Sequence, residues 1–89
     1  MTNQDWRVEL ASSARRDIKR LDRQVQARIL AALDGLTTQP PTGDVKRLSG
    51  QPAESRLRVG DWRVRFTRDA ASRTITVQRV LPRGRAYRD

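Results

Sequence analysis

Residues 56–66 read RLRVGDWRVRF, a segment in which apolar and arginine side chains alternate on both sides of a Gly-Asp pair. Alternation with a period of two is typical of a strand that buries one face. Glycine readily adopts the positive φ that a tight turn requires, so Gly60-Asp61 predicts a hairpin. We therefore expect two antiparallel strands that share an apolar face and an arginine face. The arginines on that second face are Arg56, Arg58, Arg63 and Arg65.

The residues before this hairpin predict a strand and two helices. Residues 6–10 (WRVEL) alternate between apolar and charged side chains, as in a half-buried strand. Between Ser12 and Leu36 the apolar residues recur at intervals of three and four, which predicts helix. Asp22 is a candidate N-cap that separates a short first helix from a longer second one. The prolines of residues 37–43 (TTQPPTG) cannot continue a helix and therefore end the second one.

The last predicted strand spans Thr74–Val80, but its alternation slips near the end. Arg79 would share the face of Val77, whereas Val80 would lie on the opposite face. A β-bulge within Gln78–Val80 would restore the apolar face and redirect the residues that follow.

These elements predict a single α+β domain over residues 1–89 with the order β-α-α-β-β-β. A helical hairpin with one apolar stripe needs a sheet to cover that stripe, so we expect the two helices to pack on a small twisted antiparallel sheet. The first ten residues, MTNQDWRVEL, lack the apolar segment of a signal peptide, and the sequence contains no apolar run long enough to cross a membrane. We therefore expect a cytoplasmic protein with no membrane partner.

Positive charge concentrates in the second half of the chain. Residues 1–44 contain seven lysines and arginines and six acidic residues, whereas residues 45–89 contain twelve and four, so the net charges are +1 and +8. Such a surface favours polyanionic partners: RNA, DNA, or an acidic protein that competes with them. A solvated face that only aids solubility is the alternative. It fits less well, because Glu54 and Asp61 are the acidic residues near the hairpin arginines and unbalanced like charges across a hairpin are destabilising.

The sequence contains neither cysteine nor histidine. These absences exclude thiolate metal sites, Cys-His and Ser-His nucleophile systems, and the two-histidine scheme of acid-base nucleases. We therefore expect a site without metal or other cofactor.

Three segments carry a resemblance to a known family. They read KRLSG at residues 46–50, ESRLRVGDWRVRF at residues 54–66 and VLPRGRAYR at residues 80–88. In this order they resemble the RelE/ParE superfamily of bacterial type II toxins, and the resemblance extends over almost the whole chain. It implies a small antiparallel sheet packed on two helices. RelE-like members cut messenger RNA in the ribosomal decoding site with the ribose 2′-hydroxyl as nucleophile, whereas ParE-like members inhibit DNA gyrase and lack the nuclease residues.

Matched position by position, the RelE-like pattern implies catalytic roles for Arg63, Arg83 and Tyr87. The two arginines would hold the scissile phosphate, since a guanidinium with a pKa above about 12 cannot accept a proton near neutrality. Tyr87 would act as base toward the 2′-hydroxyl or stack on a nucleobase. Packing of this tyrosine over the sheet edge is the structural alternative. The residues expected to bind RNA are Lys46, Arg56, Arg58, Arg65 and Arg85.

This sequence departs from the family pattern at two places. Arg56 and Arg58 replace the lysines of the best-known members, which removes two alternative bases. Pro82 precedes Arg83 where many members carry lysine or histidine.

The function expected from these features is that of a metal-independent, ribosome-dependent messenger RNA endonuclease. A ParE-like gyrase inhibitor and a plain nucleic-acid-binding module are the alternatives. The resemblance also implies a RelB-like antitoxin, whose acidic segment would wrap around the toxin and cover its positive charge. The remaining expected partners are messenger RNA and the ribosome, with operator DNA bound only through the toxin-antitoxin complex.

Overall fold

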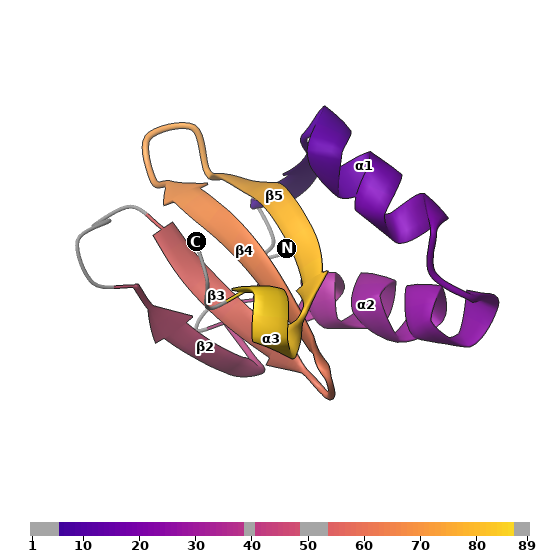
Figure 1. Cartoon of the computed structure of the whole chain (residues 1–89). Helices are drawn as coiled ribbons and strands as arrows, with labels where there is room; N and C mark the ends of the chain where they lie inside the picture. The colour runs from indigo at the N-terminus through magenta and orange to yellow at the C-terminus, as the bar shows by residue number, and fades with distance from the viewer. Residues whose placement is uncertain (1–5, 39–40, 49–53, 87–89) are drawn as a thin grey trace.

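The computed structural model describes residues 6–38, 41–48 and 54–86 (Figure 1). Within these residues one mixed sheet carries helices on both of its faces. The elements are β1 (Arg7–Leu10), α1 (Ser12–Lys19), α2 (Arg23–Gly35), β2 (Asp44–Arg47), β3 (Glu54–Val59), β4 (Trp62–Asp69), β5 (Thr74–Pro82) and α3 (Arg83–Ala86).

The sheet has the strand order β1-β5-β4-β3-β2. The pairs β3-β4 and β4-β5 are antiparallel, as predicted, and β2 adds a further antiparallel pair with β3, but β1 pairs with β5 in parallel. A parallel pair needs a long crossover connection, and α1, α2 and the strands that follow them provide it. The prediction of an α+β fold with two helices on a sheet is confirmed, and the expectation of a purely antiparallel sheet is corrected at this edge.

Strand β2 and helix α3 were not predicted. All four residues of β2 are exposed, so no alternation of apolar and polar side chains marks them in the sequence. The strand forms through its ladder with β3, in which Asp44 lies opposite Arg58 and Arg47 lies opposite Ser55. Helix α3 is a single turn that begins directly after Pro82.

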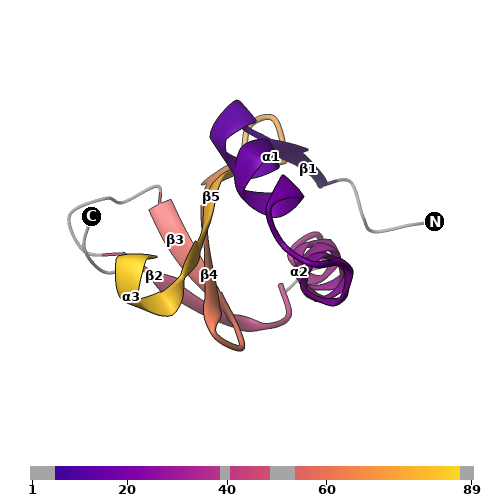
Figure 2. The same ribbon diagram turned by 45° about the vertical axis from the view of Figure 1, so that its right-hand side comes forward.

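Helices α1 and α2 cover one face of the sheet, and α3 lies on the opposite face (Figure 2). Asp22 caps α2 as predicted, because its Oδ1 accepts a hydrogen bond from the Val25 N–H at 3.0 Å. The core lies between the helices and the sheet and includes Ile29 and Leu33 of α2. Residues from the strands complete it: Leu57, Val64, Phe66, Ile75, Val77 and Val80.

The predicted bulge is present in β5. Arg65 pairs with Arg79 and Phe66 pairs with Val77, so Gln78 is the additional residue on β5. Val77 and Val80 are 0% and 2% exposed, which shows that both valines reach the core. The bulge turns Arg79 away from the core, as the sequence pattern required.

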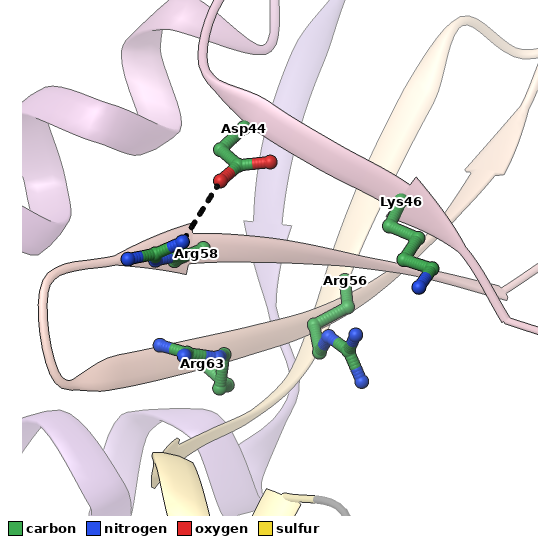
Figure 3. Close-up of a pocket in the computed structure, with 5 residues that line it drawn as sticks. All are labelled: Asp44, Lys46, Arg56, Arg58 and Arg63. Carbon is green, nitrogen blue, oxygen red and sulfur yellow. Dashed lines mark ion pairs between the residues drawn. The ribbon is translucent and has the colours of Figure 1, made fainter.

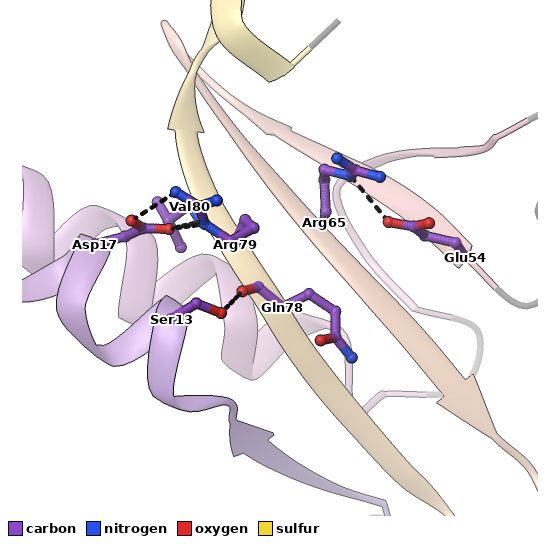
Figure 4. Close-up of polar contacts among 7 residues, drawn as sticks. All are labelled: Ser13, Asp17, Glu54, Arg65, Gln78, Arg79 and Val80. Carbon is purple, nitrogen blue, oxygen red and sulfur yellow. Dashed lines mark hydrogen bonds and ion pairs between the residues drawn. The ribbon is translucent and has the colours of Figure 1, made fainter. Parts of the chain in front are cut away.

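Helix α1 covers the part of β5 that extends beyond its partner β1 (Figure 4). The Ser13 hydroxyl donates to the Gln78 carbonyl at 2.7 Å. Asp17 accepts the Val80 N–H at 2.8 Å and pairs with Arg79, whose Nε lies 2.8 Å from Asp17 Oδ2. Burial alone would raise the pKa of Asp17, but the hydrogen bonds from Arg79 and Val80, together with the charges of Arg79 and Arg20, outweigh it and lower this pKa below the ordinary aspartate value.

In the described ranges, no helix combines the length and the apolar character needed to cross a membrane.

Candidate functional site

As predicted, the arginines of the hairpin lie on one face of the sheet, the face that points away from α1 and α2. The strand register arranges its residues in two rows that cross β2, β3, β4 and β5. Residues directly opposite each other on neighbouring strands have Cβ atoms about 4.5–5.5 Å apart, so each row is a continuous line of side chains. The first row holds Asp44, Arg58, Arg63 and Leu81, and the second holds Lys46, Arg56, Arg65 and Arg79.

An open hollow of about 200 Å³ lies over the β2 and β3 part of this face, and we call it the basic hollow (Figure 3). Four cationic side chains and one carboxylate line it, so its charge favours an anionic ligand such as a phosphate. The lining residues are Asp44, Lys46, Arg56, Arg58 and Arg63.

The carboxylate forms an exposed ion pair inside the hollow. Asp44 Oδ2 lies 3.7 Å from Arg58 Nη1, and these side chains are 63% and 62% exposed. Ion pairs this exposed typically contribute about 0–1 kcal/mol to stability. A phosphate can therefore compete with Asp44 for Arg58 at little cost.

Arg63 is a buried cation at the basic hollow, held by backbone carbonyls. The residue is 5% exposed, although it lies on the arginine face. Its Nη1 donates to the Gly60 carbonyl at 2.8 Å and to the Trp62 carbonyl at 3.0 Å. Gly60 has a φ of 58°, so the turn that glycine permits also supplies a carbonyl that orients the guanidinium. Such a preoriented donor can stabilise charge without reorganising during a reaction.

Arg65 belongs to the same face but is engaged by a carboxylate. Its Nε donates to Glu54 Oε2 at 2.9 Å, and the two side chains are 17% and 13% exposed (Figure 4). Arg79, the next residue of its row, pairs with Asp17. Asp17, Asp44 and Glu54 are therefore carboxylates that offset part of the charge of the arginine face. The sequence indicated only the last of these.

The carboxy-terminal part of the predicted site begins at Arg83. This residue is exposed, and its N–H donates to the Asp61 carbonyl of the hairpin turn at 2.9 Å. Helix α3 packs against β4 and β5 on the arginine face. Arg85 lies in α3, but its side chain is not among those that the structure describes, and Tyr87 lies outside the described residues.

The structure thus brings together Lys46, Arg56, Arg58 and Arg63 from the predicted set. It also adds Asp44, which sequence reasoning missed. The signal for Asp44 is weak, because it follows the Pro-Pro loop in an exposed segment and acquires its place only through pairing with Arg58. Among the described residues, no three acidic side chains come together as ligands for a metal ion.

Comparison with known proteins identifies relatives of this chain. The family model described as "ParE toxin of type II toxin-antitoxin system, parDE" matches residues 8–87. A search of curated proteins found no significant match.

Several solved structures share the fold of this chain. RelE in the archaeal RelE-RelB complex of Pyrococcus horikoshii is 27% identical, with a TM-score of 0.78 over 91% of this chain and 98% of that one. The RelBE2 toxin-antitoxin complex of Mycobacterium tuberculosis contains a chain that is 24% identical, with a TM-score of 0.76 over 88% of this chain and 98% of that one. The isolated RelE toxin of E. coli is 14% identical, with a TM-score of 0.75 over 86% of this chain and 83% of that one.

The family match extends over nearly all of the residues that form the helices, the sheet and the basic hollow. The shared fold agrees with it and confirms the resemblance drawn from the sequence motifs. This chain belongs to the ParE toxin family of type II toxin-antitoxin systems, within the RelE/ParE superfamily.

Proposed function

We propose that this toxin is a messenger RNA endonuclease that acts on the ribosome without a metal ion and uses the ribose 2′-hydroxyl as nucleophile. The observation that supports this proposal is the basic hollow, in which cations from three neighbouring strands surround one small open site. An open hollow lined by cations can receive the sugar-phosphate backbone of single-stranded RNA.

The basic side chains would act electrostatically. Arg58 is exposed and can donate two parallel hydrogen bonds to a phosphate. Arg63 is preoriented and would stabilise the charge that develops on the phosphate oxygens. Removing one such donor lowers rates by about 10²–10³ in well-studied enzymes. Arg83, at the start of α3, would add a further cation to the scissile phosphate, and Tyr87 would stack on a nucleobase or accept a proton.

The same face would also bind the partner chains. The P. horikoshii and M. tuberculosis relatives were solved as toxin-antitoxin complexes. We propose that this toxin likewise has a RelB-like antitoxin, and that an acidic segment of the antitoxin competes with RNA for the arginine face. Messenger RNA and the ribosome would be its targets in the cytoplasm, and operator DNA would bind only through the complex.

The decisive test maps messenger RNA ends after the toxin is induced in translating cells. We expect discrete cuts with the wild type and a large loss of cutting with Arg58→Ala and with Arg83→Ala, both of which alter exposed residues. Arg23→Ala, on α2, removes the same charge from the helix side and should leave the cuts unchanged. A folded wild-type toxin that arrests growth without any cuts would contradict the proposal.

Inhibition of DNA gyrase is the second candidate function. The family model that matches this chain carries the description of the ParE toxin, and ParE-like toxins inhibit gyrase. In that case the basic face would dock on a protein target and cut nothing. Supercoiling by purified gyrase, measured with and without the toxin, separates the two functions. Inhibition there, together with intact messenger RNA, would favour the gyrase inhibitor.

A further inference from the structure

We propose that Asp44 accepts the proton of the ribose 2′-hydroxyl during RNA cleavage, an inference that rests on the endonuclease function proposed above. The sequence suggested Tyr87 for this step. The structure instead places a carboxylate of strand β2 at the wall of the basic hollow, among the side chains that would hold the phosphate.

The chemistry of the lining residues singles out Asp44. Lysine and arginine side chains ordinarily keep their protons at pH 7, so they bind anions rather than accept protons. Among the described residues that line the basic hollow, Asp44 is the carboxylate. Carboxylates serve as general bases in enzymes when they lie within reach of the proton that they remove.

The strand register gives Asp44 the required proximity to the phosphate-binding arginines. Asp44 lies opposite Arg58, and Arg58 lies opposite Arg63. Cross-strand neighbours are separated by about 5 Å, so a phosphate held by these two arginines lies within one nucleotide of the carboxylate. A 2′-hydroxyl is attached to the same ribose as the phosphate that it attacks, so a nucleotide bound by these arginines can bring its 2′-hydroxyl within reach of Asp44.

The backbone before Asp44 fixes this position. Gly43 has a φ of +107°, and a Cβ built on it would lie 2.9 Å from Leu57 Cδ1. Glycine is therefore required where the chain enters β2 close against β3. In contrast, the side chain of Asp44 is 63% exposed and its contact with Arg58 is long, so the carboxylate can turn toward a substrate hydroxyl.

The proposed step is a transesterification. Asp44 takes the proton of the 2′-hydroxyl as the 2′-oxygen forms a bond to phosphorus, and the bond from phosphorus to the 5′-oxygen breaks. The 5′-oxygen takes a proton from solvent water, and Asp44 later returns its own proton to solvent. The products are a 2′,3′-cyclic phosphate and a 5′-hydroxyl, while Arg58 and Arg63 stabilise the charge on the phosphate oxygens.

A purely electrostatic role for Asp44 predicts a different outcome. A negative charge in the basic hollow weakens the attraction of RNA, so removing it should strengthen RNA binding in either case. If Asp44 is the base, removal should also abolish most of the cleavage. If Asp44 only tunes the charge, removal should leave cleavage unchanged or faster.

The test compares Asp44→Asn with the wild type in single-turnover cleavage of a defined messenger RNA on purified ribosomes at pH 7. We expect Asp44→Asn to cut about 10²–10⁴-fold more slowly while it binds RNA at least as tightly. Asp44→Glu keeps a carboxylate and should recover part of the rate. Asp34→Asn, on the helix side, is the charge-matched control and should cut like the wild type.

The outcomes separate this inference from the proposed function. Cutting by Asp44→Asn at the wild-type rate would overturn the role of Asp44 and leave the endonuclease function standing. Loss of cutting in Asp44→Glu equal to that in Asp44→Asn would also overturn it. A folded wild type that cuts nothing would instead contradict the endonuclease function itself.

Discussion

The helix-covered face of the sheet presents Leu57, Val64 and Phe66, each at most 1% exposed, whereas the opposite face of the same strands presents a grid of arginines. The first face is stabilised by close packing against α2, which tolerates little change in side-chain volume. The second face consists of like charges, and the ion pairs with Asp17, Asp44 and Glu54 offset part of them. One face is therefore built for stability, and the other keeps positive charge available for a ligand.

The largest expected effect comes from breaking the packed face. Phe66→Ala removes a fully buried ring and leaves a cavity under α2, so we expect the free energy of unfolding to fall by about 3–5 kcal/mol. Urea denaturation followed by circular dichroism measures this change. A loss below about 1 kcal/mol would mean that the helices do not pack on this face as described.

The ion pair between α1 and β5 should give the next largest effect. Asp17→Asn weakens the interactions with Arg79 and Val80, and we expect it to reduce the free energy of unfolding by about 1.5–3 kcal/mol at pH 7. The lowered pKa of Asp17 means that its contribution is complete above the ordinary aspartate value of 3.8 and is lost as the pH falls through the lower, folded value. The difference between wild type and variant should therefore shrink in strongly acidic solution. A difference that stays constant down to pH 2 would contradict this assignment.

A smaller effect on stability is expected on the arginine face itself. Glu54→Gln removes the charge that pairs with Arg65, and we expect a loss of about 1–1.5 kcal/mol, because both side chains are largely shielded from water. Thermal denaturation at low and high salt measures it. An unchanged melting temperature would show that the arginine face needs no carboxylate at this position.

The smallest effect on stability is expected at the basic hollow. Arg58→Ala removes an exposed ion pair with Asp44, so the free energy of unfolding should change by less than about 1 kcal/mol. The same change should lower the slope of RNA affinity against salt concentration by about 0.7, the value for one phosphate contact on a single strand. Arg23→Ala, on α2, should leave that slope unaltered. Equal slopes for Arg58→Ala and the wild type would exclude a phosphate contact at Arg58.

Much of the fold could be predicted because its signals are local. The alternation in RLRVGDWRVRF predicted the hairpin and its two faces, and helical spacing with Asp22 as cap predicted the two helices. The slip near Gln78 predicted the bulge, since a buried valine on each side of it needs one additional residue. In the candidate site, the same alternation placed Arg56, Arg58 and Arg63 on one face.

The sequence by itself determined which side chains face the core and which face solvent, because periods of two and of about 3.6 are properties of single elements. Tertiary structure decided the strand neighbours outside the predicted hairpin. It paired exposed β2 with β3, placed β1 parallel to β5, and brought Asp44 to Arg58 and Asp17 to Arg79. Those contacts join segments distant in the chain and depend on the register between strands, which short-range alternation does not encode.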